Sequence, residues 1–171
     1  ILNKGNLVSK DLNIKSKNIE NTGTIYGDLS LVLTSDKYIN KNSAITAGNI
    51  LTLNSIVEND GNILGEKVTF TGTEIKNTGN ITGEDTLHIT SDLNNTGTVQ
   101  GKNLVSIIGN IDNSQNIKSE KVLNISGNII NTGYIYSENA EITGNINNNG
   151  DILSLLNMKI TGNVINNKNM S

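Results

Sequence analysis

A seven-residue pattern, apolar-x-Asn-x-Gly-x-apolar, recurs along the whole 171-residue sequence. Its copies begin at Ile1, Ile19, Ile39, Val57, Ile75, Leu93, Ile111, Ile129, Ile146 and Val164. Successive copies are 18, 20, 18, 18, 18, 18, 18, 17 and 18 residues apart. A fixed period of this length indicates a solenoid, in which each repeat forms one coil and buries its apolar side chains only when a neighbouring coil stacks on it.

Asparagine occupies the third position of nine of the ten copies, and Lys41 is the exception. These asparagines are Asn3, Asn21, Asn59, Asn77, Asn95, Asn113, Asn131, Asn148 and Asn166. Seven copies have glycine at the fifth position, and both residue types favour tight turns. Because stacked strands are about 4.8 Å apart, asparagine amides at one turn can bond one another along the stack. We therefore interpret these asparagines as a structural ladder.

Two apolar patterns follow each turn. The seventh position of every copy is aliphatic or Met, and a pair of apolar residues in alternation, such as Leu31 and Leu33 or Leu87 and Ile89, comes later in most coils. Alternation is typical of half-buried strands, and no segment has a helical period with caps. The sequence predicts an all-β fold, a right-handed parallel β-helix (solenoid) of about nine coils of about 18 residues. A left-handed β-helix is the alternative, because apolar positions 1, 7 and often 13 also fit a hexapeptide spacing.

The coil that starts at Ile19 is irregular, because the next copy begins 20 residues later. Ile39 and Ile45 match the pattern at its first and seventh positions. We expect the two extra residues to bulge outward between Leu29 and Tyr38, and we expect Ile39 and Ile45 to be buried.

Composition limits the classes of partner. The net charge of −3 provides no basic surface for nucleic acid or acidic lipid, and no apolar run is long enough to span a membrane. We expect no nucleic-acid partner and no membrane insertion. The sequence starts on a repeat position and stops inside another. We therefore expect a single β-helical repeat domain over residues 1–171, an internal fragment of a longer exoprotein.

The segment Asn77-Thr78-Gly79-Asn80-Ile81-Thr82-Gly83, followed by a Leu-x-Ile alternation, resembles the haemagglutinin repeat of filamentous-haemagglutinin-type exoproteins. The resemblance extends over essentially the whole chain. That family includes adhesins and contact-dependent growth-inhibition toxins exported by two-partner secretion. The resemblance implies a right-handed β-helical shaft that is secreted or held at the outer-membrane surface of a Gram-negative bacterium. It also implies an outer-membrane two-partner secretion transporter as a partner, recognised through parts outside this fragment.

The favoured functional interpretation is a structural and binding shaft of a surface adhesin, which mediates cell adhesion or presents a distal domain. Its partner would be a receptor or glycan on a host or neighbouring cell. The alternatives are the stalk of a contact-dependent growth-inhibition toxin and a carbohydrate-active β-helix enzyme. The resemblance provides no catalytic residue.

Few residues are candidates for catalysis or metal binding. A charged column follows the small residues of the coils, at Lys10, Asp28, Glu66, Glu84, Lys102, Glu120 and Glu138. Its mixed signs favour a solvated stripe over the acidic cleft of a glycosidase. His88 lies between Leu87 and Ile89, so alternation turns it outward, and a single exposed His cannot form a zinc site. We expect no catalytic residue, no cofactor and no metal site.

Tyr134 and Tyr136 flank Ile135, so both should project from one outer face of the coil. Exposed tyrosines can stack on sugar rings or anchor a protein partner. We therefore regard Tyr134 and Tyr136 as candidate ligand contacts, with ordinary surface packing as the alternative. Tyr26 lies six coils away, so no extended aromatic platform is expected.

Overall fold

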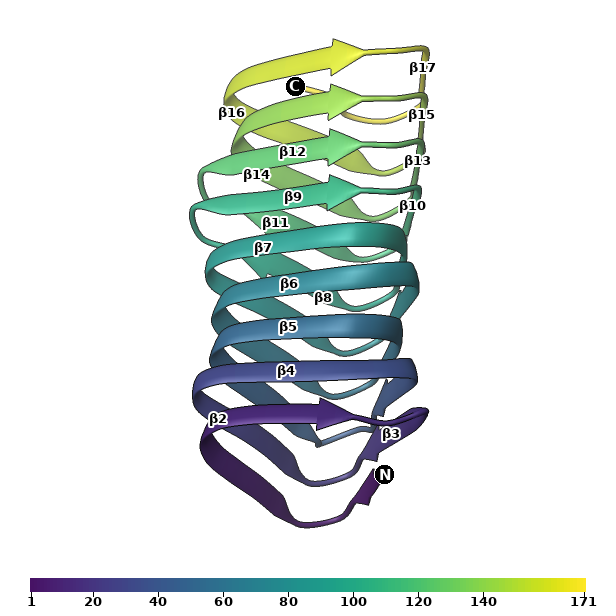
Figure 1. Ribbon diagram of the computed structural model, residues 1–171. Helices are drawn as coiled ribbons and strands as arrows, with labels where there is room; N and C mark the ends of the chain where they lie inside the picture. Colours follow the sequence, from purple (N-terminus) through teal and green to yellow (C-terminus); the bar gives the residue numbers. More distant parts are fainter.

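The computed structural model describes residues 1–171 as a parallel β-solenoid (Figure 1). The chain makes about nine turns of about 18 residues each. Its 17 strands belong to one hydrogen-bonded system, and the two termini lie at opposite ends of the stack. The prediction of an all-β parallel solenoid is confirmed.

The longest strands lie between Thr24 and Asn95. The first coil contains β1 (Leu2–Asn3), β2 (Asn6–Lys15) and β3 (Asn18–Asn21). Four long strands then bend around the corners of successive coils: β4 (Thr24–Asn40), β5 (Ile45–Asn59), β6 (Asn62–Asn77) and β7 (Asn80–Asn95). The remaining strands are β8 (Thr98–Gly101), β9 (Leu104–Ile108), β10 (Ile111–Asn113), β11 (Asn116–Ser119), β12 (Val122–Ser126), β13 (Ile129–Asn131), β14 (Tyr134–Thr143), β15 (Ile146–Asn148), β16 (Asp151–Thr161) and β17 (Val164–Asn166).

Each strand pairs in parallel with the strand one coil away. Ile63 in β6 pairs with Ile81 in β7, for example, and Ile117 in β11 pairs with Ile135 in β14. Because the register is kept from coil to coil, residues of one type stack into columns that run along the solenoid.

Four such columns form a continuous apolar interior. Their buried members are Ile19, Val57, Ile75, Leu93, Ile111, Ile129 and Ile146; Ile25, Ile63, Ile81, Val99, Ile117, Ile135 and Ile152; Leu31, Leu51, Val68, Leu87, Val105, Leu123 and Ala140; and Ile14, Leu33, Leu53, Phe70, Ile89, Ile107, Ile125 and Ile142. Each side chain packs against its equivalents above and below, so one coil alone could not bury them.

A column of small residues occupies a tight corner of the coil. At Gly83, an added Cβ would lie 2.4 Å from the carbonyl oxygen of Thr86, so no larger side chain fits there without a shift of the backbone. Ser119 and Ser137 hold the same position in later coils, and their hydroxyl groups are buried without a hydrogen-bond partner. The column therefore holds only glycine or serine in these coils.

The register around the second coil differs from the prediction. Tyr38, and not Ile39, is the buried residue that stacks between Ile19 and Val57. Ile39 points outward and is half-buried, and Ile45 is 39% exposed. Thr46 takes the buried place that Ile45 was expected to fill. The prediction that Ile39 and Ile45 are buried is therefore wrong.

The extra residues enter at two corners. One lies at Asp28–Leu29, where the pairing of β2 with β4 shifts by one residue. Two more lie in the loop 41–44, which connects β4 to β5 and contains Ser43 at a φ of 67°. The outward bulge was thus predicted correctly in kind, but most of it lies after Tyr38 and not before it.

Tyr38 explains why a threonine interrupts the aliphatic column. Its buried hydroxyl group bonds to Thr46 Oγ1 and lies 3.3 Å from Asn40 Oδ1. Thr46 Oγ1 also donates to Asn40 Oδ1 at 3.0 Å. A buried hydroxyl without a partner costs about 1–3 kcal/mol, so a tyrosine at this position requires a polar residue such as Thr46 nearby.

Because of Tyr38, the stability of the fold should decrease at alkaline pH. Burial raises the pKa of Tyr38 well above its usual range, although its hydrogen bonds oppose that shift. In the unfolded chain a tyrosine ionises near pH 10, roughly its reference pKa. The folded chain keeps the proton, so this contribution to stability is complete below that pH and is lost as the pH rises above it.

We expect Tyr38→Phe to lose about 1 kcal/mol at neutral pH and to lose less additional stability than the parent chain above pH 10. Urea unfolding between pH 7 and pH 11 measures both effects. The other tyrosines remain in the variant and serve as the internal control. Parallel pH profiles for the two proteins would contradict the assignment of a buried, protonated Tyr38.

The solenoid should behave as a rod in solution. Nine steps separate the ten rungs from Asn3 to Asn166, and at about 4.8 Å per step they span roughly 43 Å. Small-angle X-ray scattering from the monomer should give the profile of an elongated particle. A profile typical of a near-spherical protein of 171 residues would contradict the stacked-coil arrangement.

Candidate functional site

The predicted asparagines form one continuous ladder, with Asn40 in the place that was assigned to Lys41. All of its members are buried except Asn166, which is exposed at the C-terminal end. Nδ2 of each asparagine donates to Oδ1 of the asparagine in the next coil, at distances between 2.7 and 3.0 Å. The rungs are Asn3, Asn21, Asn40, Asn59, Asn77, Asn95, Asn113, Asn131, Asn148 and Asn166. All donors point toward the C-terminal end, so the amides form one aligned chain.

Each rung also closes its own turn. Asn95 Nδ2 donates to the carbonyl oxygens of Gly97 and Asn116 at 3.0 Å, and the Gly97 amide donates to Asn95 Oδ1 at 3.3 Å. The Asn95 side chain is fully buried. Its polar atoms are therefore engaged inside the solenoid, and the column is structural.

A second, exposed ladder runs along another corner. Asn110 donates from its backbone amide and from Nδ2 to Asp92 Oδ1, at 2.7 and 3.3 Å. The same pair of contacts repeats upward through the next coils at Asn128, Asn145 and Asn163. The sequence analysis missed this ladder, although a glycine directly precedes each of its asparagines and forms a recurring Gly-Asn pair.

The glycines of those Gly-Asn pairs are required by the backbone. Gly109, Gly127, Gly144 and Gly162 have φ values between 144° and 157°. A Cβ at Gly127 would lie 2.0 Å from the carbonyl oxygen of Gly109 one coil below. The repeated glycine marks a corner at which successive backbones approach too closely for a side chain.

Tyr134 and Tyr136 project from the same outer face, as predicted. Their ring centroids are 6.0 Å apart and the ring planes differ by 9°. Lys118 Nζ, from the coil below, lies 5.8 Å from the centroid of the Tyr136 ring. Tyr26 lies six coils away in the outward column of Tyr136. A hydrogen bond to Asp28 raises the pKa of Tyr26. The role of Tyr134 and Tyr136 as ligand contacts stays a prediction.

A shallow hollow of 310 Å³ opens beside Tyr134, and we call it the Tyr134 hollow. Tyr134 is its only hydrophobic lining residue. The other lining residues are Ser114, Gln115, Asn116, Thr132, Gly133, Asn149, Gly150, Asp151 and Lys168. They come from the turns that follow the buried asparagines and from the first residues of the strands after those turns.

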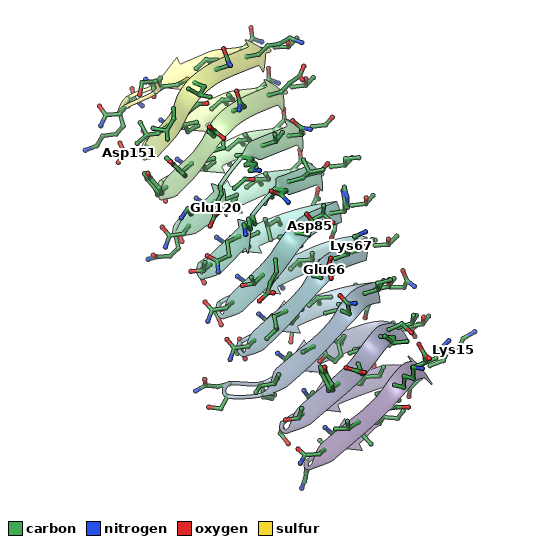
Figure 2. All side chains as sticks on the ribbon, turned by 90° about the vertical axis from the view of Figure 1, so that its left-hand side faces the viewer. Lys15, Glu66, Lys67, Asp85, Glu120 and Asp151 are labelled. Carbon is green, nitrogen blue, oxygen red and sulfur yellow. The ribbon has the colours of Figure 1, made fainter.

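The charged column lines a second groove on the outer face, over β7, β8 and the end of β11. Glu84, Lys102 and Glu120 line it in three successive coils, with Lys118 beside them, and its volume is 290 Å³. Figure 2 shows Glu66, Lys67, Asp85 and Glu120 projecting from one side of the rod. Carboxylate and ammonium groups alternate here. The groove therefore offers both hydrogen-bond donors and acceptors to a polar ligand, and it carries little net charge.

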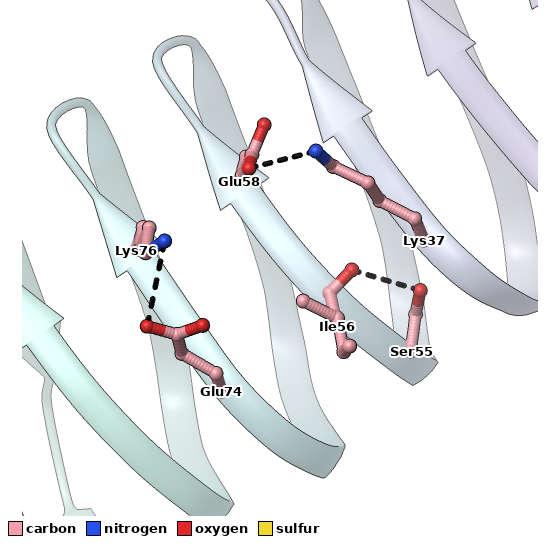
Figure 3. A network of polar contacts seen from close by, with 6 residues as sticks. All are labelled: Lys37, Ser55, Ile56, Glu58, Glu74 and Lys76. Atoms are coloured by element: carbon pink, nitrogen blue, oxygen red, sulfur yellow. Dashed lines mark hydrogen bonds and ion pairs between the residues drawn. The ribbon is translucent and has the colours of Figure 1, made fainter.

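Ion pairs on another face are exposed. Lys37 Nζ lies 2.8 Å from Glu58 Oε1, and Lys76 Nζ lies 3.6 Å from Glu74 Oε1 (Figure 3). Exposed pairs of this kind contribute about 0–1 kcal/mol each, so they add little to the stability of the fold.

His88 is exposed, as the alternation predicted. No group of three or more His, Cys, Asp or Glu residues is placed to hold a metal ion. No helix in the structure is long and apolar enough to cross a membrane.

The buried ladder makes a local prediction. Replacing Asn95 by Ala removes an acceptor from Asn77 and a donor from Asn113, and each unmet buried group costs about 1–3 kcal/mol. We expect Asn95→Ala to lose more stability than Thr96→Ala, which removes one hydroxyl of an exposed residue and its long, 3.4 Å hydrogen bond to the Asn77 carbonyl oxygen. Hydrogen exchange should rise in the coils from Ile75 to Ile129 and change little near Ile1 or Val164, because coils contact only their neighbours. An equal rise in hydrogen exchange along the whole rod on Asn95→Ala would contradict this interpretation.

Comparisons with protein-family models, with curated proteins and with solved structures found no match to this chain. A functional assignment therefore depends on the chemistry of the outer faces and on the repeat itself.

Proposed function

We propose that this chain is a structural and binding shaft of a secreted or surface-exposed bacterial adhesin. The observation that carries the proposal is the unbroken ladder of ten asparagines, nine of them buried, which fixes every coil to the next from Asn3 to Asn166. Such a stack is an extended, regular body with a long lateral surface, which suits projection away from a cell and contact with another surface.

The lateral surface supports a role in binding. Its hollows are shallow, polar and open, and they lie on the outer faces of strands whose inner faces are locked into the core. A receptor or glycan of a host or neighbouring cell could approach them without any movement of the solenoid. The repeat pattern's resemblance to filamentous-haemagglutinin-type exoproteins agrees with export by two-partner secretion and with a place at the outer-membrane surface.

Adhesion by the isolated chain tests the proposal. Fluorescent beads coated with the 171-residue protein should attach to cultured epithelial cells or to neighbouring bacteria more than beads coated with albumin do. Soluble protein added in excess should reduce the attachment, because it would occupy the same receptors. Attachment no greater than that of albumin-coated beads on both kinds of cell would contradict a binding role for this shaft.

A further inference from the structure

We propose that the Tyr134 hollow binds a neutral glycan, with one sugar ring stacked on the Tyr134 side chain. This inference specifies the ligand of the adhesin shaft and so rests on that proposed function. The hollow combines one aromatic ring with amides and hydroxyl groups and has no aliphatic lining. A sugar has an apolar C–H face and a rim of hydroxyl groups, so it fits an aromatic surface surrounded by hydrogen-bonding side chains.

The side chains of Gln115 and Asn116 are free to bind such a ligand. Both residues are exposed, and only their backbone atoms enter the internal hydrogen bonds. A side-chain amide offers two donors and one acceptor, which matches neighbouring hydroxyl groups on a sugar. By contrast, the buried ladder asparagines one turn away have no polar atom available.

The Tyr134 ring is held in place before a ligand arrives. Tyr136 stacks beside it with a centroid separation of 6.0 Å, and Lys118 lies 5.8 Å from the Tyr136 centroid. A side chain that is already ordered loses less conformational entropy on binding. Tyr136 is therefore a positioning residue in this proposal, and Tyr134 is the residue that touches the sugar.

The charge of the hollow favours a neutral ligand over a sulphated or carboxylated one. Its lining contains one carboxylate, Asp151, and one ammonium group, Lys168, and Asp151 Oδ1 accepts a hydrogen bond from Asn169 at 3.0 Å. The groove across the strands is also balanced, with Glu84 and Glu120 against Lys102 and Lys118. A polyanion would meet no excess of positive charge in either place.

A titration with oligosaccharides tests the inference on the whole chain. The probes are the hexasaccharides of β-linked glucose, galactose and N-acetylglucosamine, and a heparin-derived hexasaccharide. Binding is followed by NMR shifts of the Tyr134 ring and of the Gln115 and Asn116 amides. We expect at least one neutral probe to bind with a dissociation constant on the order of 1 mM, equivalent to about −4 kcal/mol.

The variants separate stacking from stability. Tyr134→Ala should weaken binding about tenfold or more, which corresponds to about 1.4 kcal/mol, and Tyr136→Ala should weaken it less. Gln115→Leu, at an exposed turn position, should also weaken binding while leaving the fold intact. Tyr26→Ala is the matched control, because Tyr26 holds the same outward column as Tyr136 and lies six coils away. It should not change the affinity.

Three outcomes would overturn the inference: no neutral probe binds, only the heparin-derived probe binds, or Tyr134→Ala and Gln115→Leu both bind as the parent chain does. Bead adhesion distinguishes this failure from failure of the shaft proposal. If no neutral probe binds and the beads attach to cells equally well with and without Tyr134, the adhesin role stands and the glycan site is removed. The titration uses no cells, so its result stands whether or not the beads attach.

Discussion

The fold depends on hydrogen bonds between coils, and the buried asparagine ladder is where those bonds are most specific. An amide in an apolar interior is tolerated only when its donors and acceptor are met. Here Nδ2 of Asn77 meets Oδ1 of Asn95 at 2.8 Å and also reaches two carbonyl oxygens. A slip of one residue would turn the asparagine outward and carry an outward side chain into the core, so the ladder fixes the register of every coil.

The irregular second coil shows how strict this constraint is. Extra residues enter at Asp28–Leu29 and in the loop 41–44, yet Asn21, Asn40 and Asn59 remain bonded in sequence at 3.0 and 2.8 Å. Insertions are accepted at corners, where the backbone can leave the stack, and the strands on either side return to register. The cost falls on the surface, where Leu29 is 44% exposed.

The repeat predicted the architecture because stacked coils place equivalent residues at equivalent positions. It failed in the second coil, where one side-chain contact decides which residues are buried. Aligning the repeat on its first and seventh apolar positions placed Ile39 and Ile45 inside. The structure reverses this choice because the hydroxyl groups of Tyr38 and Thr46 satisfy one another and Asn40. That pairing links positions eight residues apart and leaves no periodic trace.

The candidate site was predictable in part. Alternation around Ile135 was sufficient to place Tyr134 and Tyr136 on one outer face, because side chains on a strand alternate by rule. The polar lining of the Tyr134 hollow was not predictable in the same way. It assembles turn residues from four successive coils, and only the register of the finished stack shows which of them become neighbours.

Stability and recognition are separated in this molecule by the two faces of each strand. The outward column through Tyr134 changes from Asn116 below it to Asp151 above it, whereas the adjacent inward column stays aliphatic through Ile117 and Ile152. Inward residues contact the same column in both neighbouring coils, so a change there disturbs three coils at once. Outward residues that lie outside the exposed asparagine ladder can change without disturbing the core, and a binding surface can therefore be built at one level of the rod without altering the inward columns that support it.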